Sequence, residues 1–123
     1  MLNSVMVVDD ERSIRDAVEQ WLSLSGFSVQ LFSRAEECLA QLPVNFPGVI
    51  LSDVRMPGLG GLELLARVQQ QDADLPVILL TGHGDVPMAV EAMREGAYDF
   101  LEKPFSPESL LNSLRRALDK RRL

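Results

Sequence analysis

The sequence predicts an α/β fold in which one parallel β-sheet lies between two layers of helices. Short, wholly apolar segments recur along the chain, and they alternate with longer segments whose apolar residues repeat every three or four positions. The connections between these segments are short. Wholly apolar strands need cover on both faces, which is typical of parallel sheets. The 123 residues suit one domain with a single core.

The first predicted strand and helix occupy residues 4–26. Residues Ser4–Val8 are mostly apolar and rich in β-branched valine, so they predict a buried strand. The helix that follows ends at Gly26, and its apolar residues fall on one face: Ile14, Ala17, Val18, Trp21 and Leu22. We expect Trp21 to lie in the core with the rest of this stripe.

A second strand and helix follow within residues 28–43. Residues Ser28–Phe32 predict the strand. Ser33 and Glu36 have the spacing of a capping box, in which each side chain binds a free amide at the start of a helix. The helix stops before Pro43, and its apolar face contains Ala35, Cys38, Leu39 and Leu42.

The third and fourth predicted strands are wholly apolar. Val49–Leu51 form the third strand, which stops at Ser52 and Asp53, and Pro76–Leu80 form the fourth. A loop and a helix connect these two strands. The loop contains Pro57, Gly58, Gly60 and Gly61, and the helix carries Leu62, Leu65 and Val68 on its apolar face.

The last third of the chain predicts two more helices and one strand. Thr81–Gly84 form a loop, Gly96 ends the next helix, and Tyr98–Leu101 form a short strand. The face of the helix before Gly96 contains Val86, Ala89, Val90 and Met93. Ser106 and Pro107 begin the last helix. No stop signal follows Pro107, so we expect the chain to continue into a longer protein.

Charge and composition narrow the class of protein. The formal net charge is −6, yet the last nine residues hold five of the twelve basic residues. The acidic body argues against nucleic-acid contact, and we interpret the basic end as a solvated helix end rather than a DNA contact. Cys38 is the single cysteine, so no internal disulfide can form. No apolar run suits a membrane helix or a signal peptide, and we expect a cytoplasmic location.

Polar residues follow four of the five predicted strands at the point where each strand ends. Asp9 and Asp10 follow the first strand, Asp53 the third, Thr81 the fourth and Lys103 the fifth. In an open parallel sheet, binding sites form at the carboxyl ends of the strands. We therefore expect these five side chains to lie close together.

The predicted cluster has the chemistry of a magnesium and phosphate site. Three neighbouring carboxylates repel one another unless a cation lies among them, and Mg²⁺ prefers oxygen ligands. Lys103 adds a compact charge that suits phosphate, and Thr81 adds a hydroxyl donor. The alternative for Asp9 and Asp10 is that they merely cap the first helix. We interpret His83 as a loop residue.

Four motifs resemble one known family over nearly the whole chain. They are the DD pair, SDVRMPG around Asp53, LLTGHG with Thr81, and YDFLEKPF with Lys103. Together they resemble the receiver domain of bacterial response regulators. The segment TGHGDVPMAVEAMREGAYDFLEKPF resembles the NtrC-like, sigma-54-dependent activators, and within them regulators of four-carbon dicarboxylate transport. The resemblance implies a flavodoxin-like (βα)5 fold with strand order 2-1-3-4-5, in one receiver domain at residues 1–121.

The resemblance also implies a role for each site residue. Asp53 would accept the phosphoryl group and Lys103 would pair with it. Thr81 and Phe100 would act as the switch, although Phe100 stands where many members have tyrosine. The Mg²⁺ would be bound by Asp10, Asp53 and the backbone carbonyl of Arg55, with Asp9 acting through water. The Lys103–Pro104 peptide bond would be cis.

The implied function is that of a signalling domain rather than an enzyme with an outside substrate. A phosphohistidine on a sensor histidine kinase would donate the phosphoryl group. We expect a homodimer through the last helix or through the surface of the fourth helix, fifth strand and last helix, including Val86, Ala89 and Tyr98. Two alternatives stay open: a Mg²⁺-dependent aspartyl phosphohydrolase, and a receiver-like binding module that takes no phosphate. The short loops argue against the first, and the intact cluster argues against the second.

Overall fold

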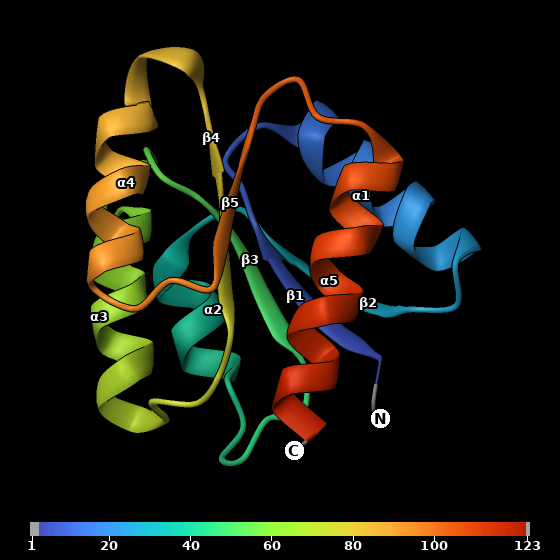
Figure 1. Ribbon diagram of the computed structural model, residues 1–123, viewed down its shortest axis with the longest axis horizontal. Helices are drawn as coiled ribbons and strands as arrows, with labels where there is room; N and C mark the ends of the chain where they lie inside the picture. The colour runs from blue at the N-terminus through green and yellow to red at the C-terminus, as the bar shows by residue number, and fades with distance from the viewer. Residues whose placement is uncertain (1–2, 123) are drawn as a thin grey trace.

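Five parallel strands form a single sheet in the computed structural model, which describes residues 3–122 (Figure 1). The order in the sheet is β2-β1-β3-β4-β5, so the predicted fold class and strand order are confirmed. Residues 1–2 of the predicted domain, 1–121, lie outside the described residues. The strands are β1 (Ser4–Val8), β2 (Ser28–Phe32), β3 (Val49–Asp53), β4 (Val77–Thr81) and β5 (Asp99–Glu102).

Helices cover both faces of this sheet. In Figure 1, α2, α3 and α4 lie on one side of the sheet, and α1 and α5 lie on the other. A short 3-10 turn, η1 (His83–Asp85), leads into α4. The α-helices are α1 (Arg12–Leu24), α2 (Ala35–Gln41), α3 (Gly61–Gln71), α4 (Val86–Arg94) and α5 (Pro107–Arg122). This two-sided cover explains why the central strands are apolar at successive positions.

The core has two parts because successive strand residues point to opposite faces of the sheet. In β1, Met6 and Val8 pack in the part beneath α2, α3 and α4. Val5 and Val7 pack with residues of α1 and α5, including Leu22 and Leu114. All four β1 side chains are at most 1% exposed. None of the helices among residues 3–122 combines the length and the apolar character needed to cross a bilayer.

The predicted capping box of α2 is wrong. The Ser33 hydroxyl donates to a carboxylate oxygen of Glu37 at 3.1 Å, and no side chain caps the helix. The helix begins at Ala35, after Arg34, so Ser33 lies one residue before the position that a cap requires. Pairing with the side chain four residues on satisfies the hydroxyl instead.

The predicted apolar face of α4 is only partly correct. Ala89 and Ala92 are fully buried, whereas Val90 is 44% exposed and Met93 37% exposed. Ala89 therefore cannot belong to a docking surface, which corrects that expectation. The two alanines turn toward the sheet because small side chains let the helix approach it closely. Trp21 is also less buried than expected, since its indole is half-buried and meets Phe105 edge-on at 6.0 Å.

Candidate functional site

The carboxyl ends of four strands bring the predicted site residues together. Asp53 is the last residue of β3 and Thr81 the last residue of β4, while Asp9 directly follows β1. The strand register places Asp53 beside Leu80, and the Lys103 amide donates to the Thr81 carbonyl at 2.7 Å. The five predicted side chains therefore gather at one edge of the sheet, as the sequence indicates.

Three carboxylates form the centre of this cluster. Each of Asp9, Asp10 and Asp53 offers an oxygen, and these oxygens all lie within 4.8 Å of one another. Asp9 is fully buried and Asp53 is 6% exposed, whereas Asp10 is exposed. Two of the three charges are therefore held away from water, where neighbouring like charges repel most strongly.

Lys103 supplies the positive charge beside them. Its ammonium lies 3.0 Å from Asp9 Oδ2, 3.5 Å from Asp53 Oδ1 and 3.4 Å from Glu11 Oε1. The Lys103–Pro104 peptide bond is cis, as the family resemblance implies. The ammonium thus has three carboxylates around it, and it is positioned to contact any group attached to Asp53.

Burial dominates the electrostatics of the two inner carboxyls. Burial, together with the charges of Asp9 and Asp10, raises the pKa of Asp53 to about 6, although Lys103 opposes the rise. Burial also raises the pKa of Asp9, against the hydrogen bonds from Glu11 and Lys103. Burial alone would lower the pKa of Lys103. The hydrogen bond to Asp9 and the negative charges of Asp9 and Asp53 outweigh burial, so the pKa of Lys103 is raised. The site therefore favours extra positive charge.

Thr81 ends β4 at the edge of the sheet that carries the cluster, and Phe100 lies on the same face of the sheet, beside Leu79. The Thr81 side chain is fully buried, and its hydroxyl donates to the Gly82 carbonyl at 3.1 Å. In the register of β4 and β5, Thr81 pairs with Glu102 and Leu79 pairs with Phe100. Phe100 is half-buried and packs against the core beneath α4. Thr81 and Phe100 are therefore neighbours on one face of the sheet, on the side covered by α4.

The β3–α3 loop contacts the turn that precedes α4. The guanidinium of Arg55 donates to Asp85 Oδ1 at 2.9 Å, and this bond and charge raise the pKa of Arg55. The Gly61 amide donates to the Val54 carbonyl at 2.8 Å, and Glu63 accepts the Gly60 amide at 3.2 Å. These bonds hold the loop in place close to Asp53.

The cluster fits a magnesium ion. Asp9, Asp10 and Asp53 bring hard oxygen ligands within 4.8 Å of one another, and burial with the neighbouring carboxylates raises the pKa of Asp53, so a cation here would be favourable. That Asp10, Asp53 and the backbone carbonyl of Arg55 bind the ion directly, with Asp9 acting through water, stays a prediction. Both Asp9 oxygens have protein partners: Oδ1 accepts the Glu11 amide at 2.9 Å and Oδ2 the Lys103 ammonium.

Two contacts of the site do not follow from the sequence patterns. Glu11 reaches Lys103, and Arg15 donates to the Asp9 carbonyl at 2.7 Å. The position of Glu11, directly after the acidic pair, could have drawn attention to it. His83, expected to be a loop residue, lies in η1, where its ring is largely exposed and bonds Glu102 at 2.8 Å. The alternative in which Asp9 and Asp10 merely cap the first helix is wrong. Glu11 precedes α1 and no side chain caps it, while Asp9 Oδ1 accepts the amide of Glu11 itself.

Sequence comparison finds close relatives. The C4-dicarboxylate transport transcriptional regulatory protein DctD of Rhizobium meliloti (strain 1021) is 52% identical over 120 residues, which cover 98% of this chain and 26% of that protein. DctD of Pseudomonas aeruginosa is 55% identical over 119 residues and is likewise covered to 26%. The transcriptional regulatory protein FixJ of Bradyrhizobium diazoefficiens is 47% identical over 114 residues, 93% of this chain and 56% of that protein. The chain thus spans about a quarter of the length of the DctD relatives.

Solved structures agree with these relatives. Full-length FixJ from B. japonicum superposes with a TM-score of 0.87 at 43% identity, covering 97% of this chain and 59% of that one. NtrX from Brucella abortus in complex with ADP gives a TM-score of 0.88 at 38% identity, covering 99% and 28%. The family described as the response regulator receiver domain matches residues 5–115. With the match extending over most of its length, this chain belongs to the response regulator receiver domain family.

Proposed function

We propose that this domain accepts a phosphoryl group on Asp53 from a phosphohistidine of a sensor histidine kinase. The observation that carries the proposal is the placement of Asp53. Its carboxylate is almost fully buried at the end of β3, yet it lies 3.5 Å from the Lys103 ammonium and among two further carboxylates. A carboxylate in such a position is suited to be a covalent phosphate acceptor rather than a structural group.

The transfer step needs positioning and charge neutralisation. An oxygen of Asp53 attacks the phosphorus, the bond from phosphorus to the histidine nitrogen breaks, and its electron pair stays on the imidazole. Lys103 neutralises part of the negative charge on the phosphoryl oxygens, since it already faces Asp53 Oδ1. When bound by Asp10, Asp53 and the Arg55 carbonyl, Mg²⁺ would supply further charge neutralisation. Asp9 acts by holding Lys103 in place.

Thr81 and Phe100 carry the signal away from Asp53 in this proposal. The new phosphoryl oxygens offer the Thr81 hydroxyl a stronger acceptor than the Gly82 carbonyl that it now contacts. Phe100 lies on the same face of the sheet, so it would follow the threonine and rearrange the packing beneath α4. Phenylalanine has no hydroxyl, so the switch here would act through packing.

The output proposed for the domain is control of a sigma-54-dependent transcriptional activator in the cytoplasm. The support is its similarity to DctD and to the DNA-binding transcriptional regulator NtrC of Salmonella typhimurium, which is 43% identical over 114 residues. Phosphorylation would control a homodimer formed through α4, β5 and α5, or through α5 alone. Val90 and Met93 are the exposed apolar side chains of α4 that would take part. The proposal includes no nucleic-acid or membrane contact by this domain.

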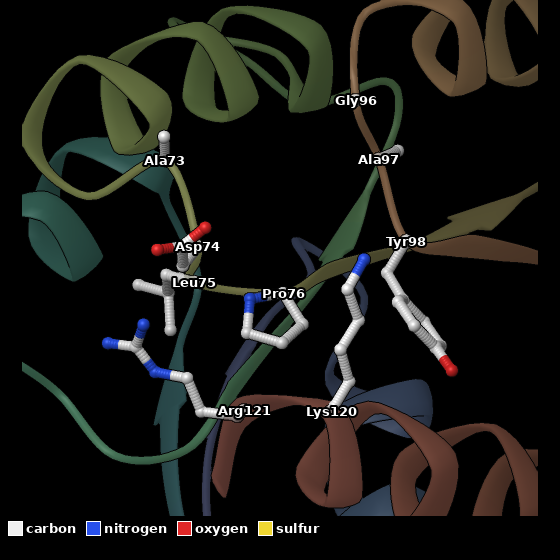
Figure 2. Close-up of a pocket in the computed structure, with 9 residues that line it drawn as sticks. All are labelled: Ala73, Asp74, Leu75, Pro76, Gly96, Ala97, Tyr98, Lys120 and Arg121. Atoms are coloured by element: carbon white, nitrogen blue, oxygen red, sulfur yellow. The ribbon is translucent and has the colours of Figure 1, made fainter. Parts of the chain in front are cut away.

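Hydrolysis of an outside phosphate ester is less favoured by the geometry. A phosphohydrolase needs a substrate cavity beside its nucleophile. A cavity of about 590 Å³ lies at the other edge of the sheet, before β4 and β5, and none of the site residues lines it (Figure 2). Figure 2 shows Lys120 and Arg121 of α5 beside Pro76 and Tyr98 at this cavity.

The decisive experiment maps the modified residue. The protein is incubated with acetyl phosphate and Mg²⁺, the acyl phosphate is trapped with borohydride, and the product is analysed by mass spectrometry. We expect modification of Asp53 alone, and none in Asp53→Asn. Modification of another residue in that variant would contradict the proposal. Light scattering with and without beryllofluoride and Mg²⁺ tests the dimer, and an unchanged monomer in both states would contradict that part.

A further inference from the structure

Glu11 contacts the lysine of the phosphorylation site although it belongs to none of the motifs described above. Its carboxylate oxygen lies 3.4 Å from the Lys103 ammonium. We infer that Glu11 is a positioning residue that acts through Lys103. In the unphosphorylated protein it shares the ammonium with Asp53, at 3.4 Å against 3.5 Å, and so competes with the incoming phosphoryl oxygens and slows phosphoryl transfer. This inference rests on the function proposed above and assigns one of its rate-setting residues.

The three carboxylates around Lys103 differ in how easily each can be released. Asp9 is fully buried, and its second oxygen is held by the Glu11 amide at 2.9 Å. Asp53 is the acceptor itself and is almost fully buried. The side chain of Glu11 is 57% exposed, so its carboxylate can turn into water at little cost. Glu11 is therefore the partner that Lys103 exchanges for a phosphoryl oxygen.

Two effects of Glu11 act in the same direction. An ammonium that is shared with Glu11 offers one donor fewer to the phosphoryl group on its way to Asp53. The carboxylate of Glu11 also places one more negative charge near an incoming anion. Because the pair is largely exposed, its contribution is modest, and we expect a change in rate of about two- to fivefold when it is removed.

The side chain of Glu11 can be tested separately from its backbone. The amide that orients Asp9 remains in Glu11→Gln, which removes only the competing carboxylate. Glu11→Asp keeps the charge but draws the carboxylate back by one methylene, so it weakens the contact with Lys103. Glu102→Gln is the matched control, because that carboxylate lies next to Lys103 in the chain but bonds His83 at 2.8 Å.

The test measures the rate of Asp53 modification with two donors in the presence of Mg²⁺. Acetyl phosphate is a dianion near neutral pH and phosphoramidate a monoanion, so the repulsion from the Glu11 charge acts more strongly on the first donor, whereas the competition for Lys103 acts on both. We expect Glu11→Gln to react about two- to fivefold faster than wild type with both donors. The rate of Glu11→Asp should lie between the rates of wild type and Glu11→Gln. The rate of Glu102→Gln should stay close to that of wild type.

A second measurement does not depend on turnover. Trp21 is the single tryptophan of the chain and meets Phe105, two residues beyond Lys103. Its fluorescence can report the binding of beryllofluoride, a phosphoryl mimic, with Mg²⁺. We expect Glu11→Gln to bind beryllofluoride about two- to fivefold more tightly than wild type, because Lys103 is then free to contact it.

The outcomes distinguish this inference from the proposed function. If wild type is modified at Asp53 but Glu11→Gln reacts at the same rate or more slowly, the role of Glu11 is overturned and the proposed function stands. An equal acceleration in Glu102→Gln would overturn it too, because a general charge effect would then explain the result. No modification of wild type at Asp53 would overturn the proposed function, and this inference with it.

Discussion

The Lys103 ammonium lies 3.0 Å from Asp9 Oδ2, and it joins the end of β5 to the end of β1 across 94 positions of sequence. The Asp9 carboxylate is fully buried, and the Lys103 side chain is only 16% exposed. A buried carboxylate that loses its ion-pair partner is unfavourable, since it must be neutralised or hydrated. Lys103 therefore contributes to folding as well as to the proposed phosphoryl transfer.

Lys103→Met separates these two contributions. We expect phosphorylation by acetyl phosphate to fall about 100-fold, because a positioned charge on the developing phosphoryl oxygens is lost. We also expect the free energy of unfolding to fall by roughly 1–3 kcal/mol, because the buried Asp9 is left unpaired. Urea denaturation and the rate of Asp53 modification measure the two effects. A variant that retains wild-type stability would show that Asp9 does not need this partner.

Asp53→Asn should stabilise the protein in metal-free buffer above pH 6. The pKa of Asp53 is raised from 3.8 to about 6, so the folded protein binds more protons than the unfolded chain between these values. Stability from this group is fully present below pH 3.8 and is lost as the pH rises through 6. The amide, which stays neutral, should recover at most about 3 kcal/mol at pH 7.5.

The measurement is urea denaturation of both proteins at pH 4 and pH 7.5 with chelator present. The difference between them should be small at pH 4 and large at pH 7.5. Adding Mg²⁺ at pH 7.5 should stabilise wild type more than Asp53→Asn, because the ion offsets the charge of the carboxylate. A stabilisation by the amide that is equal at both pH values would show that the Asp53 charge is not its cause.

The site is predictable because it depends on strand ends, and strand ends are visible in the sequence. Each wholly apolar run stops at a polar residue, so the sequence alone predicts that Asp53, Thr81 and Lys103 share one edge of the sheet. The motif resemblance then implies their roles. Neither the strand ends nor the motifs indicate which of the long, flexible side chains form ion pairs. The contacts Lys103–Glu11 and Arg55–Asp85 were therefore not predicted.

Short helices are predicted less well than strands. In α4 (VPMAVEAMR) every residue except Glu91 and Arg94 is apolar, so apolar side chains surround the helix and periodicity does not decide which side is buried. Packing decides it, because small alanines allow close approach to the sheet. At α2, the local signal of Ser33 is overridden by its bond with Glu37. The first error arises because the buried face of α4 depends on its contacts with the sheet. The second arises because Ser33 bonds Glu37, which lies outside the predicted capping box.

Gly61→Ala should displace the backbone at the end of β3, at the proposed acceptor Asp53. A Cβ at this position would lie 2.5 Å from the Asp53 carbonyl oxygen and 3.0 Å from the Val54 Cα, so backbone would have to move. We expect a loss of stability of about 1–3 kcal/mol and slower Asp53 modification. Gly84→Ala is the control, since nothing lies within 4 Å of its added Cβ. Equal effects of the two substitutions would contradict the close packing at Gly61.

Arg121 anchors the last turn of α5 to two other parts of the fold. Its guanidinium donates to the Phe46 carbonyl at 2.7 Å and to Asp72 Oδ2 at 2.5 Å, and its side chain is 14% exposed. We expect Arg121→Ala to lower the free energy of unfolding by roughly 1–3 kcal/mol, because the Phe46 carbonyl and the Asp72 carboxylate lose a shared donor. Arg116→Ala is the control, since that side chain is 65% exposed and its guanidinium approaches Asp99 no closer than 3.7 Å. We expect this control to change the free energy of unfolding by less than about 0.5 kcal/mol.

The pH dependence of the Arg121 effect identifies the charge pair as its source. The hydrogen bond from Arg121 lowers the pKa of Asp72 below its ordinary value of 3.8. Stability from this pair is therefore present above pH 3.8 and is lost as the pH falls through the lowered value. The difference between wild type and Arg121→Ala should shrink in urea denaturation at pH 2.5 compared with pH 6. A difference that stays constant would assign the effect to the Phe46 carbonyl and to packing of the aliphatic stem, because neither of these titrates.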